Sequence, residues 1–206
     1  MSQYFYIHPE NPQKRLLKQA ALIIQQGGLI AYPTDSAYAL GCAMGERNAL
    51  QRMRVLRALD VRHQFSLVCR DLSQIASYAK VDNSVYRLLK NVTPGPFTFL
   101  LNATKEVPKR LHGRKRQQIG IRVPDNEIVR GLLAELDAPL LSTTLILPNQ
   151  TLPMSDAEEI RELLEHQLDL VINGGHCGLE PTTVVDLSGS TPELIRQGKG
   201  DFNAFL

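Results

Sequence analysis

Short apolar runs alternate along the chain with segments in which apolar residues recur at helical spacing. The apolar runs predict strands at 29–32, 65–69, 97–103, 117–123, 139–144, 169–173, 182–187 and 193–196. Helical spacing predicts helices between Pro12 and Gly27, at 49–59, after Asp71, after Asp82, at 127–136 and after Ser155. We expect Asp71 and Asp82 to cap their helices, and Ser155 to form a capping box with Glu158.

This order of elements predicts an α/β fold built on one twisted, open, mixed sheet flanked by helices. The last strands follow one another without helices between them, which favours a mixed sheet over a purely parallel one. A chain of 206 residues with 43% hydrophobic content can bury one substantial core. No repeat or linker divides it, so we expect a single domain over 1–206.

Composition narrows the class of protein further. No apolar segment approaches the roughly 18 residues that span a bilayer, and the first residues do not resemble a secretory signal. The three cysteines are odd in number and form no C-x-x-C pair. We therefore expect a cytoplasmic protein that has no disulfide framework, no metal site and no membrane partner.

The charges are distributed unevenly along the chain. Residues 1–124 carry 19 Lys and Arg against 7 Asp and Glu, a net +12, whereas residues 125–169 carry 2 against 10, a net −8. The densest basic run is 105–122. It could be a solvated loop, or a positive surface that attracts nucleic-acid phosphates. The second reading gives five candidate RNA-binding residues: Lys109, Arg110, Arg114, Lys115 and Arg116.

Short polar patches stand where predicted strands begin or end. They read PTDS at 33–36, TPGPFT at 93–98, STT at 142–144 and PTT at 181–183. Each could be only a turn stabilised by hydroxyl groups. In open α/β sheets, however, ligands bind at strand ends, and hydroxyls there can hold phosphate or carboxylate oxygens. The familiar glycine-rich phosphate loops and the G-x-S-x-G nucleophile motif are missing.

Five segments resemble motifs of the YrdC/YciO family, in the order the family has them. They are YPTDSAYALGC at 32–42, TPGPFTFLL at 93–101, IGIRVPDN at 119–126, STT at 142–144 and PTTVVDL at 181–187. The likeness extends over nearly the whole chain and is greatest to the YciO branch. It implies a YrdC-like domain with a positively charged concave surface that binds nucleotide (ATP or AMP) and RNA, either double-stranded RNA or tRNA.

The resemblance also implies a reaction and roles for particular residues. Synthases of this family make threonylcarbamoyladenylate from threonine, bicarbonate and ATP with Mg²⁺, and the product serves to modify tRNA. By resemblance, five residues contribute to the substrate site: Thr34, Ser36, Tyr38, Arg122 and Thr182. Tyr38 would wall the cavity and Arg122 would pair with a carboxylate or phosphate. Four residues would contact the nucleotide: Arg57, Ser142, Thr144 and Arg196.

Two positions depart from the synthase pattern. The Lys-x-Arg pair of the synthases aligns with Arg57 and Leu59, and their Ser-x-Asn pair aligns with Thr144 and Ile146. Losing one cation and one amide from an ATP site costs roughly 3 to 8 kcal/mol together, or about 2 to 6 powers of ten in rate or affinity. The departures therefore predict weak or altered catalysis, unless a nearby group such as Arg54, Arg62 or His63 compensates.

Three functions remain open on the sequence. The first is a nucleotide- and RNA-binding protein with weak synthase chemistry. The second is an active threonylcarbamoyladenylate synthase with a rearranged ATP site. The third is a non-catalytic carrier or regulator that binds a small molecule. In none of them do we expect a tightly bound cofactor, and ATP and Mg²⁺ enter only as possible substrate and ion.

Overall fold

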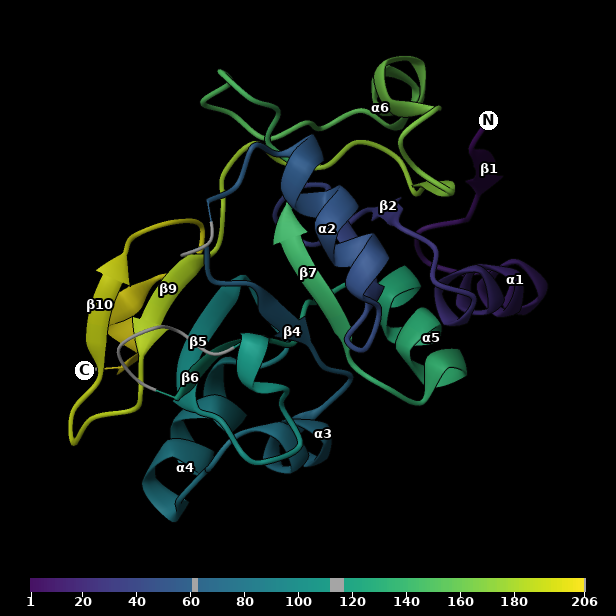
Figure 1. The fold of residues 1–206 in the computed structure, drawn as a ribbon. Coiled ribbons are helices and arrows are strands. Elements are labelled where there is room, and N and C mark those ends of the chain that lie inside the picture. The colour runs from purple at the N-terminus through teal and green to yellow at the C-terminus, as the bar shows by residue number, and fades with distance from the viewer. Residues whose placement is uncertain (61–62, 112–116, 206) are drawn as a thin grey trace.

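The computed structural model describes residues 1–60, 63–111 and 117–205. Within them one mixed sheet has the strand order β1-β8-β2-β3-β7-β4-β6-β5-β9-β10 (Figure 1). Four pairs of strands are parallel (β1 with β8, β2 with β8, β4 with β6, β5 with β9) and the other five are antiparallel. The predicted mixed α/β fold is confirmed. The strands are β1 Gln3–Tyr6, β2 Ile30–Tyr32, β3 Ala39–Ala43, β4 Ser66–Val68, β5 Phe97–Asn102, β6 Gln118–Arg122, β7 Leu140–Thr144, β8 Leu170–Asn173, β9 Thr183–Asp186 and β10 Glu193–Arg196.

Helices cover both faces of the sheet. They are α1 Lys14–Gln25, α2 Arg47–Leu56, α3 Leu72–Tyr78, α4 Asn83–Val92, α5 Glu127–Leu136 and α6 Ala157–Leu164, with short 3₁₀ helices η1 Lys109–Leu111 and η2 Phe202–Phe205. Buried residues of α2, α3, α4 and α6 join the larger core on one face. Buried residues of α1 and α5 form the smaller core on the other, and Figure 1 shows these two helices side by side.

Two of the three predicted helix caps are confirmed. The carboxylate of Asp71 accepts the N–H of Gln74, and that of Asp82 accepts the N–H groups of Ser84 and Val85, as expected. The capping box at Ser155 is wrong, because the cap of α6 is Asp156. Its carboxylate accepts two first-turn N–H groups at 2.8 and 2.9 Å, one residue further along the chain.

Two strands were not predicted. Strand β1 reads QYFY, and its aromatic residues favour a strand, whereas β3 reads ALGCA, with two alanines and a glycine that have low strand propensity. The fold nevertheless needs a glycine in β3. A Cβ at Gly41 would lie 2.5 Å from the Leu140 side chain and 2.8 Å from the Tyr32 ring, which passes over this position. The Tyr32 hydroxyl thereby reaches the hydroxyl of Ser142, 2.6 Å away on β7.

Helix α2 ends earlier than the predicted 49–59. Arg57 is its C-cap residue, and Ala58 adopts a left-handed conformation with a φ of 49°. This conformation turns the chain out of the helix before Leu59. Leu59 therefore occupies the loop that leads from α2 to β4, where it packs against the larger core.

Strand alternation leaves half of one sheet face open and polar. On β4, β5, β6 and β7, the residues Leu67, Phe99, Ile121 and Leu141 point into the larger core. Their neighbours in sequence point the opposite way, onto the face where α1 and α5 pack mainly against β8, β2 and β3. Over the remaining strands that face lacks a helix among the described residues. The polar strand-end patches lie there.

Candidate functional site

The PTDS loop connects β2 to β3 and is closed by the hydroxyl of Thr34. This oxygen accepts the N–H groups of Ser36 and Ala37, both at 3.2 Å, and donates to the carbonyl of Ala37 at 2.6 Å. The loop is thus a hydroxyl-stabilised turn, the simpler of the two sequence interpretations. It also makes a long-range contact, because Arg122 at the end of β6 reaches into it.

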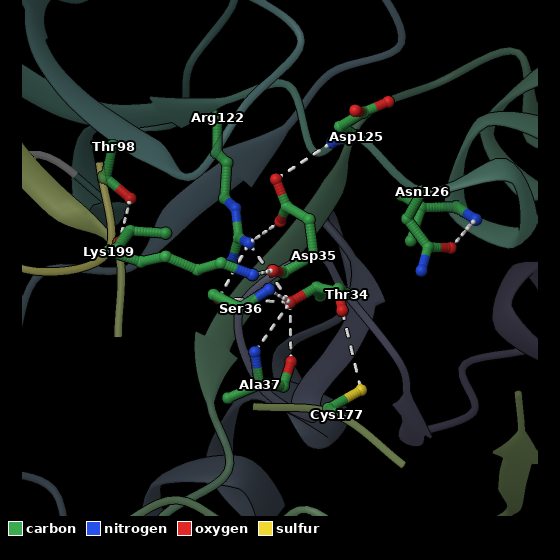
Figure 2. Close-up of polar contacts among 12 residues, drawn as sticks. Thr34, Asp35, Ser36, Ala37, Thr98, Arg122, Asp125, Asn126, Cys177 and Lys199 are labelled. Carbon is green, nitrogen blue, oxygen red and sulfur yellow. Dashed lines mark hydrogen bonds and ion pairs between the residues drawn. The ribbon is translucent and has the colours of Figure 1, made fainter. Parts of the chain in front are cut away.

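Arg122 gathers the side chains of the PTDS loop around its guanidinium. Its Nη2 donates to the hydroxyls of Thr34 and Ser36 at 3.1 and 2.9 Å and forms an ion pair with Asp35 (Figure 2). The two charged side chains are only 8% and 9% exposed. The structure therefore brings together three predicted substrate residues that are separated by more than 80 positions in sequence, and adds a carboxylate between them.

Asp35 connects this cluster to two more segments. Its second carboxylate oxygen accepts the N–H of Asp125 at 3.0 Å, just before α5 begins. Its backbone carbonyl accepts Lys199 Nζ, which extends across from the C-terminal segment (Figure 2). Arg122 Nε, by contrast, is buried and has no hydrogen-bond partner among the described residues. Such a group is a candidate donor to a ligand oxygen.

A cavity of about 390 Å³ lies on the open sheet face beside this cluster. Its floor is polar because strands β4, β6 and β7 present Ser66, Gly120 and Ser142 to it. A Cβ at Gly120 would lie 2.7 Å from the Ser66 hydroxyl, so the glycine keeps this floor open. All four residues predicted to contact a nucleotide line the cavity, and one predicted substrate residue joins them: Arg57, Ser142, Thr144, Arg196 and Thr182.

One end of the cavity is built around Thr143. Arg57 donates from Nη1 to the Thr143 hydroxyl at 2.9 Å and from Nε to the carbonyl of Ile146 at 2.8 Å. His63 Nε2 lies 3.0 Å from the same hydroxyl. Burial lowers the pKa of Arg57, and burial together with the positive charges of Arg57 and Arg54 lowers the pKa of His63 to about 4. His63 is therefore neutral at pH 7.

The other end of the cavity lies beside the Arg122 cluster. The hydroxyls of Thr98 and Thr182 are 2.8 Å apart, and Arg196 Nη2 donates to the carbonyl of Thr182 at 2.8 Å. Ile121 pairs with Phe99, so Arg122 and Thr98 lie on neighbouring strands of the same face. A ligand in the cavity thus has the Arg122 cluster within reach.

Four of the five predicted substrate residues, Thr34, Ser36, Tyr38 and Arg122, do not line the cavity. Tyr38 is fully buried in the larger core, where its hydroxyl donates to the carbonyl of Gly175 at 2.7 Å, so it does not wall the cavity. Thr34 and Ser36 belong to the Arg122 cluster and not to the cavity lining. Of the two departures from the synthase pattern, Ile146 lines the cavity, whereas Leu59 does not.

Several contributing residues were missed at the sequence level. Asp35 lies inside the PTDS patch, yet no role was assigned to its carboxylate, although a buried arginine needs an anion beside it. Thr143 and Thr98 lie inside the STT and TPGPFT patches, so their position at strand ends could have identified them as cavity residues. His63 was considered only as a compensating group, and Lys199 had no sequence signal. Both reach the site from loops.

Only part of the predicted RNA surface falls within the described residues. Lys109 and Arg110 lie exposed on η1, and Arg110 donates to the carbonyls of Met44 and Gly45. Arg114, Lys115 and Arg116 lie outside the described residues. In the part of the chain that is described, no group of three or more His, Cys, Asp or Glu side chains could hold a metal ion, and no helix is long and apolar enough to cross a membrane.

The fold and the cavity define a mixed α/β protein with a ligand site rich in hydroxyls and guanidinium groups on the open face of its sheet. The model of the Sua5/YciO/YrdC family, described as telomere recombination, matches residues 22–198, and the chain belongs to this family. The predicted family resemblance is confirmed.

Individual relatives agree with this assignment. YciO of Escherichia coli K12 is 53% identical over all of both chains, and its crystal structure matches with a TM-score of 0.96. A threonylcarbamoyl-AMP synthase of Neisseria gonorrhoeae is 28% identical, over 87% of this chain and 94% of the synthase. The family is thus related to enzymes that make threonylcarbamoyladenylate.

Sua5 of P. abyssi, crystallised with L-threonine, shares the fold. It matches with a TM-score of 0.87 at 24% identity, and the match covers 96% of this chain and 58% of Sua5. At this identity the likeness shows the fold alone.

The Asp35–Arg122 pair generates a prediction about stability. Asp35→Asn should lower the free energy of unfolding by about 3 kcal/mol, because it leaves a buried guanidinium without a counter-charge. The double variant Asp35→Asn, Arg122→Met should regain part of this loss, because the unpaired charge is then gone. Urea unfolding measures both changes.

Glu127→Gln is the matched control for this prediction. It neutralises one partner of the Glu127–Arg130 pair, whose side chains are 48% and 46% exposed, and should cost less than about 1 kcal/mol. An Asp35→Asn protein as stable as the parent would show that the pair does not hold the loop.

Proposed function

We propose that the protein binds an adenine nucleotide in the cavity, with an amino acid such as threonine beside it, and forms threonylcarbamoyladenylate only weakly. One observation carries the proposal. The four residues expected to contact a nucleotide come from positions 57 to 196 of the chain, yet all of them line one cavity. The relation to threonylcarbamoyl-AMP synthases supplies the identity of the ligands.

The chemistry of the lining suits a phosphorylated ligand. The cavity volume falls within the range of roughly 300–1,000 Å³ that small-molecule sites occupy. Arg57 and Arg196 bring guanidinium groups, which bind phosphate through paired N–H donors. Thr144 and Thr182 add hydroxyls that can contact phosphate or ribose oxygens, whereas the Ser142 hydroxyl donates its proton to the carbonyl of Leu40 at 2.9 Å and can only accept from a ligand.

The Arg122 cluster suits the carboxylate of an amino acid. Arg122 Nε is buried and unpartnered, so an arriving carboxylate oxygen would satisfy it. The Ser36 hydroxyl lies 2.9 Å from Arg122 Nη2 and can rotate its proton toward the same ligand. Asp35 already engages Nη2, so the ligand would share the guanidinium with it. The complex of P. abyssi Sua5 with L-threonine adds support from a relative.

Ile146 gives the physical reason for weak catalysis. Its side chain presents hydrocarbon to the cavity at the position where the synthases have an amide, and its carbonyl is held by Arg57. Donors aimed at developing charge are usually the largest catalytic contribution. Leu59 points into the larger core, so the missing cation at that position leaves no apolar wall in the cavity.

Mg²⁺ would have to arrive with the nucleotide. Among the described residues, the cavity lining contains no carboxylate. Mg²⁺ commonly binds through substrate phosphates with several waters retained. When bound, Mg²⁺ would neutralise part of the phosphate charge. Arg57, Arg196 and the hydroxyl groups of the cavity would bind and orient the ligand.

Nucleotide binding generates the first functional prediction. Arg57→Gln and Arg196→Gln should each weaken AMP binding about tenfold or more, because each removes a charged donor from the cavity. Isothermal titration calorimetry measures the affinities. Arg52→Gln is the control, because Arg52 is paired with Asp169 outside this cavity and should leave the affinity unchanged. Parent protein without affinity for AMP or ATP would contradict the proposed function.

Catalysis generates the second functional prediction. With ATP, threonine, bicarbonate and Mg²⁺, the parent should form little adenylate, and Ile146→Asn should raise the yield about tenfold or more by restoring a donor to the cavity. Leu59→Arg alone should do less, because position 59 lies outside the lining. Mass spectrometry detects the product. High parental yield would favour a fully active synthase, and no product from either variant would favour a non-catalytic carrier or regulator.

We propose RNA as a second ligand, either double-stranded or tRNA, and a cytoplasmic location. The net +12 of residues 1–124 and the exposed Lys109 and Arg110 support RNA binding. The three free cysteines fit the reducing cytoplasm, where thiols persist.

RNA binding generates the third prediction. Affinity for double-stranded RNA or tRNA should fall steeply between low and moderate salt, because phosphate contacts release counterions. Replacing Arg114, Lys115 and Arg116 with alanine should weaken binding and flatten this salt dependence. The control removes three equivalent charges from α1: Lys14, Arg15 and Lys18. Equal losses from both triple variants would indicate nonspecific attraction, and salt-independent binding would rule the surface out.

A further inference from the structure

We propose that His63 is an anion-binding residue of the cavity and takes up a proton when a phosphorylated ligand binds. The inference rests on the proposed function, because it adds a ligand contact to the same cavity. It makes nucleotide binding dependent on pH through one residue, which neither the family motifs nor the four predicted nucleotide contacts include.

The position of His63 supports an anion-binding role. It lies in the loop between α2 and β4, and its half-buried ring lines the cavity. The Thr143 hydroxyl is 3.0 Å from its Nε2 and 2.9 Å from Arg57 Nη1. The Phe65 ring packs edge-on against the imidazole at a centroid distance of 4.9 Å and restricts its orientation. Two side chains that can carry positive charge thus converge on one hydroxyl inside the cavity.

Protonation of His63 would change what Thr143 can donate. Arg57 has only donors, so it always occupies one lone pair of the Thr143 oxygen. When His63 Nε2 carries no proton, it accepts a hydrogen bond from the Thr143 hydroxyl. When the ring carries both protons, Nε2 donates to the second lone pair, and the Thr143 hydroxyl is free to donate to a ligand. In the tautomer whose proton is on Nδ1, uptake of a proton at Nε2 thus adds both a charge and a new donor to the cavity.

The surroundings keep this proton off until an anion arrives. Burial is the largest influence that lowers the pKa of His63, followed by the charges of Arg57 and Arg54, and Asp60 opposes them weakly. Arg54 is held nearby, with its guanidinium 4.9 Å from the centre of the Phe65 ring. A negatively charged phosphate next to the imidazole would oppose the effect of the two guanidinium charges and favour the protonated ring. The bound ligand should therefore raise the pKa.

His63 would also compensate for the cation that is missing at Leu59. The left-handed turn at Ala58 directs Leu59 into the larger core, and the same loop then brings His63 to the cavity four residues later. The synthases have a permanent charge in this part of the chain. Here the charge would be present only in the complex, so binding of ligand and binding of proton would be linked.

The test uses the methyl ester of AMP, whose single phosphate charge does not titrate near neutral pH. Its affinity for the parent should rise about tenfold or more from about pH 8 to about pH 5, because the complex binds one more proton than the free protein. His63→Gln should show a nearly flat profile, because the amide can occupy the Nε2 position but does not titrate. His166→Gln should keep the parental profile, because this exposed histidine lies outside the cavity.

A second measurement uses the unmodified protein. Histidine ring NMR signals, with His63 assigned through the variant, should show a pKa near 4 without ligand and a higher value with the methyl ester bound. A pH-independent affinity, or a pH dependence that persists in His63→Gln, would overturn this inference and leave the proposed function standing. Absence of binding at every pH would overturn both.

Discussion

The buried ion pair between Asp35 and Arg122 is the contact on which the arrangement of the site depends. It joins the β2–β3 loop to β6 across the two intervening strands β7 and β4. Removing two charges from water costs several kcal/mol for each ion, so neither side chain would remain buried without the other. Asp125 and Lys199 attach to the same aspartate. Asp35 therefore fixes three segments relative to one another: its carboxylate holds Arg122 and the start of α5, and its backbone carbonyl holds the C-terminal segment.

The cavity follows from this arrangement and from the period of two in strands. Residues such as Leu67 and Ile121 bury one face of the sheet, so Ser66 and Gly120 must face the other. Helices α1 and α5 pack against each other mainly near β8, β2 and β3, and their core includes only Leu140 of β7 and Val68 of β4 from the strands beyond. The same alternation that builds the core therefore supplies a polar floor where no helix lies among the described residues.

Much of the fold could be predicted from sequence because strand runs and caps such as Asp71 and Asp82 are local signals. Strand β3 could not be predicted, because its small residues have low strand propensity. Its glycine, Gly41, leaves the space that the Tyr32 ring occupies. In the candidate site, the hydroxyl patches at strand ends contribute residues to the cavity lining and to the Arg122 cluster.

What sequence could not provide was the direction and partner of each side chain. The Tyr38 side chain lies in the core, and the Arg122 guanidinium pairs with the carboxylate of Asp35 inside the protein. His63 lines the cavity from the loop that follows the left-handed residue Ala58, and no motif describes this placement.

The strand order has a consequence for the biosynthesis of the protein. Gln3 in β1 pairs with Leu170 in β8, and the cavity takes residues from Arg57 through Arg196. A ribosome releases these segments in sequence, so the N-terminal strand must wait for most of the chain before its partner emerges. A ligand of the cavity cannot assist the early stages of folding, because the lining is incomplete until the segment that contains Arg196 has emerged.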